Sequence, residues 1–215
     1  MNQTEEIKNL DVLKTGTITV GLICKDGIVL AADKRATSDA WIANKKETKL
    51  YKLADNVAFT TAGVVSDIQM IIKLTKAELE LKRIRTRHLP SVKEAANLFA
   101  GIVYQNIRKF SPIPGLTHFI LGGVDSDGFS LYDIYPDGSI SRIEEFVLSG
   151  AYGRIMGYGI LENEWKPNLS VEEAKKLAIK VCRSAVKRDA SVGDGINIAV
   201  IDKNGVNPIA FEKID

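Results

Sequence analysis

The sequence predicts an α+β fold in which two antiparallel sheets pack face to face and carry helices on their outer faces. Strand-like runs occur in blocks joined by short turns, paired helical runs separate these blocks, and no linker or repeat divides the chain. The 215 residues, 45% of them hydrophobic, are enough for one domain with a sizeable core.

The first half of the chain predicts two strand pairs. Apolar runs at 17–24 and 28–32 are joined at Asp26-Gly27, a dipeptide that favours a tight hairpin. Their nearly continuous apolar character indicates strands buried on both faces. A second pair is expected at 48–53 and 57–62, ended by Gly63.

Two helices follow. The spacing of apolar residues changes from two to about 3.6 and predicts an amphipathic helix over 66–87. Pro90-Ser91 starts a second helix over 92–107, which stops near the Pro-rich segment 111–115.

The second half predicts a strand meander, helices and a closing hairpin. The glycine-rich stretch 149–159 is expected to lead into a short helix around 160–165. Ser170 and Glu173 form a capping box that opens a longer helix reaching about 186. The strands are expected at 119–124, 129–135, 139–143, 196–201 and 209–211.

The composition excludes several classes of function. Lys and Arg number 29 against 27 Asp and Glu, and the net charge of +2 points neither to nucleic acid nor to an anionic membrane. Two cysteines, Cys24 and Cys182, exclude a disulfide scaffold and are expected as buried thiols. With only His88 and His118, a histidine-rich metal site is impossible, and we expect neither metal nor cofactor.

The chain shows no membrane or secretory segment. No run approaches the ~18 apolar residues of a membrane span. Residues 1–11 are polar and acidic, without the basic and apolar regions of a signal peptide. We therefore expect a cytoplasmic protein whose thiols stay reduced.

Several motifs resemble phosphate-binding or catalytic motifs only superficially. The glycines between 150 and 159 lack the Gly-Lys-Ser/Thr ending of a phosphate loop, and no Gly-x-Ser-x-Gly nucleophile turn is present. The adjacent carboxylates at 144–145 and 172–173 are typical of solvated surface charge.

Thr17 is the residue that stands out. It opens the first strand directly after Gly16, and cleavage of the Gly16–Thr17 bond would give it a free α-amine beside its hydroxyl. An α-amine with a pKa of about 7.7–8.0 is a suitable general base at neutral pH and needs no histidine. Lys49, held by Asp33, could stabilise the hydroxyl's deprotonated form, and the Gly63 N–H could bind an oxyanion. From spacing alone, a lysine and an aspartate in such strand-like runs are more often solvated or simply paired with each other.

A series of motifs runs through residues 15–205 in a fixed order. They are Thr-Gly-Thr-Ile-Thr-Val-Gly at 15–21, Lys-Asp-Gly-Ile-Val-Leu-Ala-Ala-Asp-Lys-Arg-Ala-Thr at 25–37, Thr-Thr-Ala-Gly at 60–63, Leu-Gly-Gly-Val-Asp at 121–125, Tyr-Gly-Ile-Leu-Glu at 158–162, Lys-Arg-Asp at 187–189 and Gly-Ile-Asn-Ile-Ala-Val-Ile at 195–201. In these motifs the chain closely resembles the β subunit of the archaeal proteasome core, a threonine hydrolase family.

The resemblance implies a four-layer αββα sandwich of the N-terminal-nucleophile hydrolase type. It implies a threonine endopeptidase that degrades unfolded proteins inside a barrel of stacked heptameric rings. The expected partners are proteasome α subunits, other β subunits, a regulatory ATPase acting on the α rings, and unfolded polypeptides.

The resemblance also assigns roles to residues. Residues 1–16 match a propeptide that is removed by self-cleavage at Gly16–Thr17, which leaves the hydrolase domain 17–215. The catalytic set carried over is Thr17 as nucleophile, Asp33 and Lys49 as its charged partners, Gly63 at the oxyanion hole and Asp189 as support for the threonine.

The chain departs from the family pattern at two positions. Serines that surround the threonine amine in the family correspond here to Ala151 and Val192. Loss of such hydroxyls slows catalysis if they act in the transition state. A weakly active or inactive structural β subunit, sharing the ring with a more active paralogue, is therefore the alternative function; a bacterial-type proteasome-like peptidase fits the length and motifs less well.

The same resemblance places a pocket for the residue before the scissile bond. Thr61 forms its floor, and the expected walls are Ala36, Glu47, Val65 and Gln69. We expect a mid-sized apolar side chain such as Leu to be accepted, with broad selectivity. Glu47 is expected to pair with Lys45 or Lys46; pointing inward, it would instead favour a basic side chain.

Overall fold

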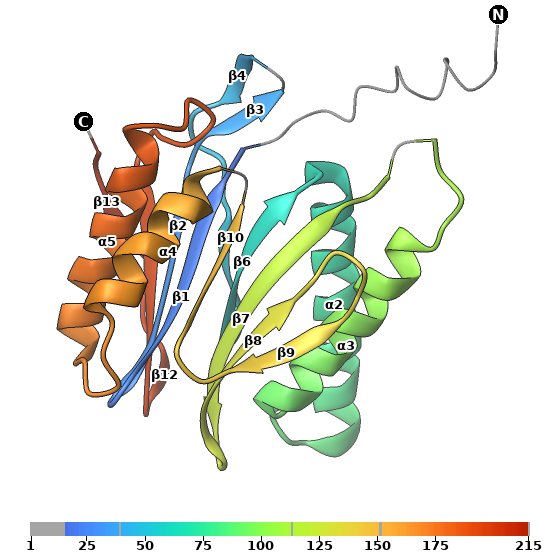
Figure 1. The fold of residues 1–215 in the computed structure, drawn as a ribbon. Coiled ribbons are helices and arrows are strands. Elements are labelled where there is room, and N and C mark those ends of the chain that lie inside the picture. Colours follow the sequence, from blue (N-terminus) through green and yellow to red (C-terminus); the bar gives the residue numbers. More distant parts are fainter. Residues whose placement is uncertain (1–15, 39, 113, 151, 215) are drawn as a thin grey trace, which may run out of the picture.

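Two antiparallel sheets form the centre of the molecule, with helices outside each (Figure 1). The computed structural model describes residues 16–38, 40–112, 114–150 and 152–214. The first sheet has the strand order β10-β1-β2-β11-β12, and β13 also pairs with β11. Its strands are β1 (Ile18–Cys24), β2 (Gly27–Asp33), β10 (Phe146–Gly150), β11 (Ile196–Asp202), β12 (Gly205–Val206) and β13 (Ala210–Glu212).

The second sheet is a meander in chain order. Its strands are β5 (Leu50–Ala54), β6 (Val57–Gly63), β7 (Thr117–Asp125), β8 (Gly128–Ile134) and β9 (Ile140–Ile143). A small separate hairpin is formed by β3 (Ala36–Ser38) and β4 (Trp41–Asn44).

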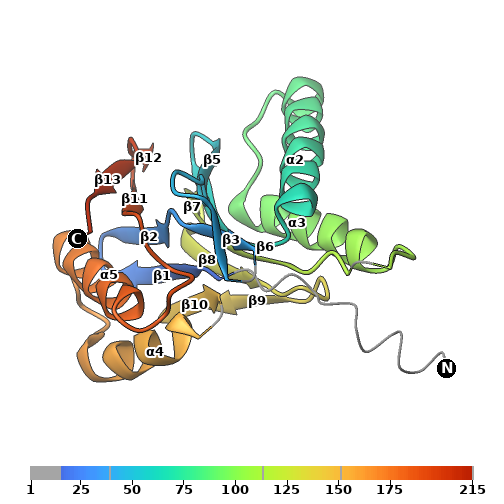
Figure 2. The ribbon, with the colours of Figure 1, turned by 90° about the horizontal axis from the view of Figure 1, so that it is seen from above.

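One helix pair covers the outer face of each sheet, as Figure 2 shows from above. The helices α2 (Val65–Thr86) and α3 (Val92–Ile107) lie on the second sheet, whereas α4 (Gly153–Glu164) and α5 (Val171–Val186) lie on the first. Both α3 and α5 start with a capping box, at Ser91 and Ser170. The predicted α+β sandwich with four layers is confirmed.

Three apolar clusters hold the layers together. The one between the sheets includes Leu30, Ile120 and Leu131, none of which is exposed. The clusters under the helices are larger: Ile18 and Val181 lie in the one beneath α4 and α5. Cys24 and Cys182 are buried as free thiols in that cluster, as predicted, and burial raises the pKa of Cys24 to about 12.

The glycine-rich stretch differs from the prediction. Residues 146–150 form strand β10 beside β1, and helix α4 begins at Gly153 rather than near 160. The glycines permit this because α4 packs closely: a methyl group at Gly153 would press on Ala185, and one at Gly157 would overlap Leu148. The β3–β4 hairpin was not predicted either, because its strands are short, β4 is mostly exposed and the sequence shows no apolar period there.

Within the described ranges, no helix is both long and apolar enough to cross a membrane. The same residues contain no group of three or more His, Cys, Asp or Glu side chains placed to hold a metal ion.

Candidate active site

The ends of several strands meet at one edge of the sandwich. Thr17 directly precedes β1, Asp33 ends β2, Lys49 directly precedes β5 and Gly63 ends β6. Because β1 and β2 are antiparallel neighbours, the start of one lies beside the end of the other. The topology therefore brings together four of the five predicted catalytic residues.

Thr17 carries the candidate nucleophile. It is 4% exposed, and its Oγ1 donates a hydrogen bond of 2.6 Å to the carbonyl oxygen of Gly16. The N–H of Gly16 donates in turn to Thr37 Oγ1 at 3.2 Å. The hydroxyl is thus held against the carbonyl group of the preceding residue.

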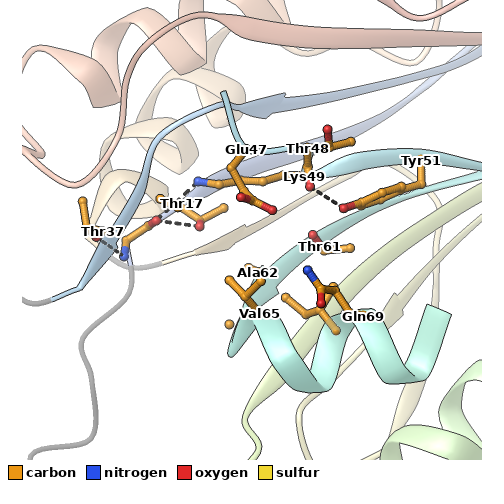
Figure 3. Close-up of a pocket in the computed structure, with 14 residues that line it drawn as sticks. Thr17, Thr37, Glu47, Thr48, Lys49, Tyr51, Thr61, Ala62, Val65 and Gln69 are labelled. Carbon is orange, nitrogen blue, oxygen red and sulfur yellow. Dashed lines mark hydrogen bonds between the residues drawn. The ribbon is translucent and has the colours of Figure 1, made fainter. Parts of the chain in front are cut away.

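Lys49 is a buried cation with three acceptors around its ammonium group. Nζ donates to Asp33 Oδ1 at 2.8 Å, to Gly16 O at 3.4 Å and to the carbonyl oxygen of Arg35. An ammonium group has three protons, so each has an acceptor. Lys49 and Thr17 therefore share the same carbonyl oxygen, that of Gly16, as Figure 3 shows.

Asp33 anchors this lysine and the surrounding backbone. The residue is fully buried, and burial raises the pKa of its carboxyl, against the opposing effect of Lys49 and of backbone donors. Oδ1 accepts from Ile18 N and Lys49 Nζ, and Oδ2 accepts from Arg35 N and Gly193 N. Four donors on two oxygens fit the ionised carboxylate, which only accepts hydrogen bonds.

Gly63 lines the same pocket as Thr17. Its φ is +119°, and a methyl group there would overlap the carbonyl oxygen of Leu116. Both the backbone conformation and the space therefore require glycine. The position agrees with a backbone donor near the reacting carbonyl.

Among the described residues, no hydrogen bond joins the Asp189 carboxylate to Thr17. Within the described residues its hydrogen bonds go to the N–H of Gly153, at 3.0 Å, and to the N–H and hydroxyl of Ser191. The carboxylate therefore binds the first turn of α4, where a negative charge is favoured.

The five predicted pocket residues line one cavity beside Thr17. Ala36, Glu47, Thr61, Val65 and Gln69 are all part of its wall, and the last four are labelled in Figure 3.

The pocket also contains residues that the sequence analysis did not name. Thr37, Thr48, Tyr51 and Ile68 are four of them. Two of them follow from periodicity, because Tyr51 lies two residues after Lys49 in an extended segment and Ile68 lies three residues after Val65 on a helix.

Glu47 differs from the expected pairing. Its Oε2 accepts a 2.8 Å hydrogen bond from Asn44 Nδ2, and no ion pair joins it to Lys45 or Lys46, both of which the structure describes. In Figure 3 the carboxylate points toward the space bounded by Thr17, Thr61 and Val65. The pocket wall is therefore acidic at this point.

Comparison with known proteins identifies the family. The family model described as "Proteasome subunit" matches residues 13–201. The proteasome subunit beta of Ferroglobus placidus is 40% identical over 205 residues, which is 95% of either chain. Those of Archaeoglobus fulgidus and Methanocaldococcus vulcanius are 38% and 41% identical, over 93% and 95% of this chain and 92% and 90% of theirs.

The chain belongs to the proteasome β-subunit family.

Two positions distinguish this β subunit from the family pattern. Val192 is fully buried in the cluster beneath α4 and α5, so its side chain serves the core. Ala151 lies outside the described residues. The hydroxyl of Ser191, next to Val192, lies against Gly16, where a methyl group would come within 1.6 Å of it.

The buried Asp33–Lys49 pair of this β subunit gives a stability prediction. Asp33→Ala leaves the Lys49 ammonium buried without its counter-ion, and we expect the free energy of unfolding to fall by ~3–5 kcal/mol. Adding Lys49→Met removes the unpaired charge and should recover much of that loss. Urea unfolding of the isolated subunit measures both effects.

The exposed pair Lys52–Asp55 is the control. Asp55→Ala should leave the free energy of unfolding close to the wild-type value, since solvent screens such pairs. Equal losses for Asp33→Ala and Asp55→Ala would contradict the central role of the buried pair.

Proposed function

We propose that this β subunit is a threonine endopeptidase that activates itself by cleaving the Gly16–Thr17 bond. The observation that carries the proposal is the 2.6 Å contact between Thr17 Oγ1 and the Gly16 carbonyl oxygen, which Lys49 Nζ also approaches. Nucleophile, scissile carbonyl and cation are already adjacent, so little rearrangement is needed before reaction.

The self-cleavage proceeds in two steps in this proposal. Thr17 Oγ attacks the Gly16 carbonyl carbon while its proton passes to solvent water, and the negative charge that develops on the carbonyl oxygen is stabilised by Lys49. The C–N bond then breaks, the amine takes up a proton, and an ester joins Gly16 to Thr17. Water hydrolyses this ester, which releases residues 1–16 with a carboxylate and leaves the domain 17–215 with a free Thr17 amine.

Peptide hydrolysis uses the free Thr17 amine that self-cleavage creates. The Thr17 amine accepts the hydroxyl proton as Oγ attacks a substrate carbonyl, and the Gly63 N–H binds the resulting oxyanion. Lys49, fixed by Asp33, favours the deprotonated oxygen. The leaving amine takes the proton, and water releases the acyl group from Thr17.

Exposed apolar side chains support assembly with other proteasome subunits. Trp41, Phe110, Tyr152 and Ile155 are large and exposed on the isolated chain. We propose heptameric β rings stacked on α rings, with an ATPase acting on the α rings, in the cytoplasm. Unfolded polypeptides would reach Thr17 inside this barrel.

The pocket supports a preference that differs from the apolar one expected from the sequence. Ala36 and Val65 offer apolar walls for a side-chain stem, and Glu47 offers a carboxylate without a cationic partner among the described residues. Lys and Arg combine an apolar stem with a charged end. We therefore propose that cleavage after a basic residue exceeds cleavage after Leu.

A structural subunit with little activity is the second candidate. Its support is Val192, whose buried side chain leaves no hydroxyl at that position of the site. A subunit of this kind would keep residues 1–16 after assembly, so the intact mass of the wild-type chain in the assembled particle separates the two candidates.

Thr17→Ala should abolish self-cleavage, because the variant has no hydroxyl to attack Gly16. Intact mass of the chain in the assembled particle should show residues 1–16 absent in the wild type and present in the variant. Thr17→Ser should still be cleaved, and Thr86→Ala, an exposed threonine at the end of α2, should match the wild type. Loss of residues 1–16 from the Thr17→Ala chain would rule out self-cleavage by Thr17.

Glu47→Gln tests the proposed basic preference. It removes the negative charge and keeps the side-chain shape, so kcat/KM should fall about 10-fold for a fluorogenic peptide ending in Arg, a change of ~1.4 kcal/mol. The matching peptide ending in Leu should change by less than about 2-fold.

Glu144→Gln, an exposed acid in the turn before β10, serves as the matched control and should alter neither peptide. A wild-type particle that cleaves after Leu far faster than after Arg, with no effect of Glu47→Gln, would restore the apolar preference.

A further inference from the structure

The side chain of Ser191 lies against the residue that precedes the candidate nucleophile. A methyl group built on Gly16 would be 1.6 Å from Ser191 Oγ and 1.9 Å from Ser191 Cβ. Since such a methyl sits about 1.5 Å from Cα, the hydroxyl oxygen lies within roughly 3 Å of Gly16 Cα. Ser191 therefore faces the peptide bond that the proposed self-cleavage breaks.

The Ser191 hydroxyl is held in place by a hydrogen bond to Asp189. Ser191 Oγ donates to Asp189 Oδ1, and Ser191 N donates to the same atom at 3.0 Å. Asp189 is 7% exposed, and its other oxygen accepts from Gly153 N. Because the Ser191 proton points to the carboxylate, the lone pairs of Oγ remain available on the side of Gly16 and Thr17.

The Asp-x-Ser turn itself is ordinary, and the chain has a second copy. At Asp137-Gly138-Ser139 the serine hydroxyl and N–H also donate to one carboxylate oxygen, at 2.6 and 2.8 Å. That copy is exposed and lies away from Thr17. What distinguishes Ser191 is its position against Gly16, not its local hydrogen bonds.

We propose that Ser191 is a positioning residue for the Thr17 amine, which rests on the proposed function above. While residues 1–16 are attached, its side chain fills the space next to Gly16 and admits only glycine there. Once they leave, its hydroxyl accepts a hydrogen bond from the Thr17 ammonium and continues to donate to Asp189. The Ser191 hydroxyl would thus link the Asp189 carboxylate, which has no hydrogen bond to Thr17 among the described residues, to the Thr17 amine.

The first test concerns the space beside Gly16 that the Ser191 side chain fills. The backbone of Gly16 lies outside the left-handed region, so alanine is excluded there only by Ser191. Gly16→Ala should block removal of residues 1–16, and Gly16→Ala with Ser191→Gly should restore it. Rotation of the Ser191 hydroxyl alone cannot make room for the alanine methyl group, because that methyl would also overlap Ser191 Cβ. Gly16→Ala with Ser139→Ala is the matched control and should stay uncleaved.

The second test concerns the amine in the processed particle. Ser191→Ala should still lose residues 1–16, since Thr17 N is an amide before cleavage. Its kcat/KM for a peptide should fall about 10-fold to 100-fold, as for a lost hydrogen bond to a charged group. A hydrogen bond accepted from the ammonium raises the amine pKa, so its loss should shift the acid limb of the pH profile to lower pH.

Other charged groups around Thr17 are unchanged in this variant. They are Lys49, Glu47, Asp33 and Asp189, together with His118 and Arg154 in the adjoining cavity that Thr17 also lines. Ser191→Thr keeps the hydroxyl and should restore both the rate and the acid limb, whereas Ser139→Ala should leave both as in the wild type.

The outcomes separate this proposal from the function on which it rests. A wild-type particle that keeps residues 1–16 and cleaves no peptide overturns both. A processed, active wild type whose Ser191→Ala variant has the same rate and pH profile overturns the positioning role alone. Normal processing of Gly16→Ala with Ser191 intact overturns the steric role.

Discussion

The arrangement of the site depends on one buried carboxylate. Asp33 accepts from Ile18 N at the start of β1, from Lys49 before β5, from Arg35 N after its own strand and from Gly193 N before β11. An ionised group without water is costly, and only such a complete set of donors makes its burial tolerable. The same bonds fix the backbone at Ile18, directly after Thr17, and hold the Lys49 ammonium where it also reaches the Gly16 carbonyl.

The sandwich provides the rigidity that this carboxylate requires. Its strand β2 lies between β1 and β11 in the first sheet, so both neighbours contribute donors at the same end. The second sheet packs on the inner face through Leu30, Ile120 and Leu131 and brings Lys49 and Gly63 to the same edge. Close-packed interiors of this kind resist small displacements, which keeps the reactive groups in register.

Much of this was predictable from the sequence. Apolar periods gave the helix pairs and most strands, and a threonine after glycine in a chain nearly without histidine pointed to Thr17. Strand β10 and the start of α4 were missed because the glycines there serve close packing against Leu148 and Ala185, which only the tertiary structure reveals. The direction of the Glu47 carboxylate depends on Asn44, and the proximity of Ser191 to Gly16 depends on two segments 175 positions apart; neither leaves a local sequence signal.

The contact between Gly193 and Asp33 links the chemistry to the order of synthesis. Residue 193 leaves the ribosome long after Thr17, Asp33 and Lys49, and the neighbouring strand β11 pairs with β2 only then. Until strand β11 docks, the Asp33 carboxylate lacks one of its four donors, and strand β2 lacks its neighbour on that side of the sheet. A nascent or truncated chain that lacks this strand therefore holds Thr17, Asp33 and Lys49 without the complete set of donors that aligns them.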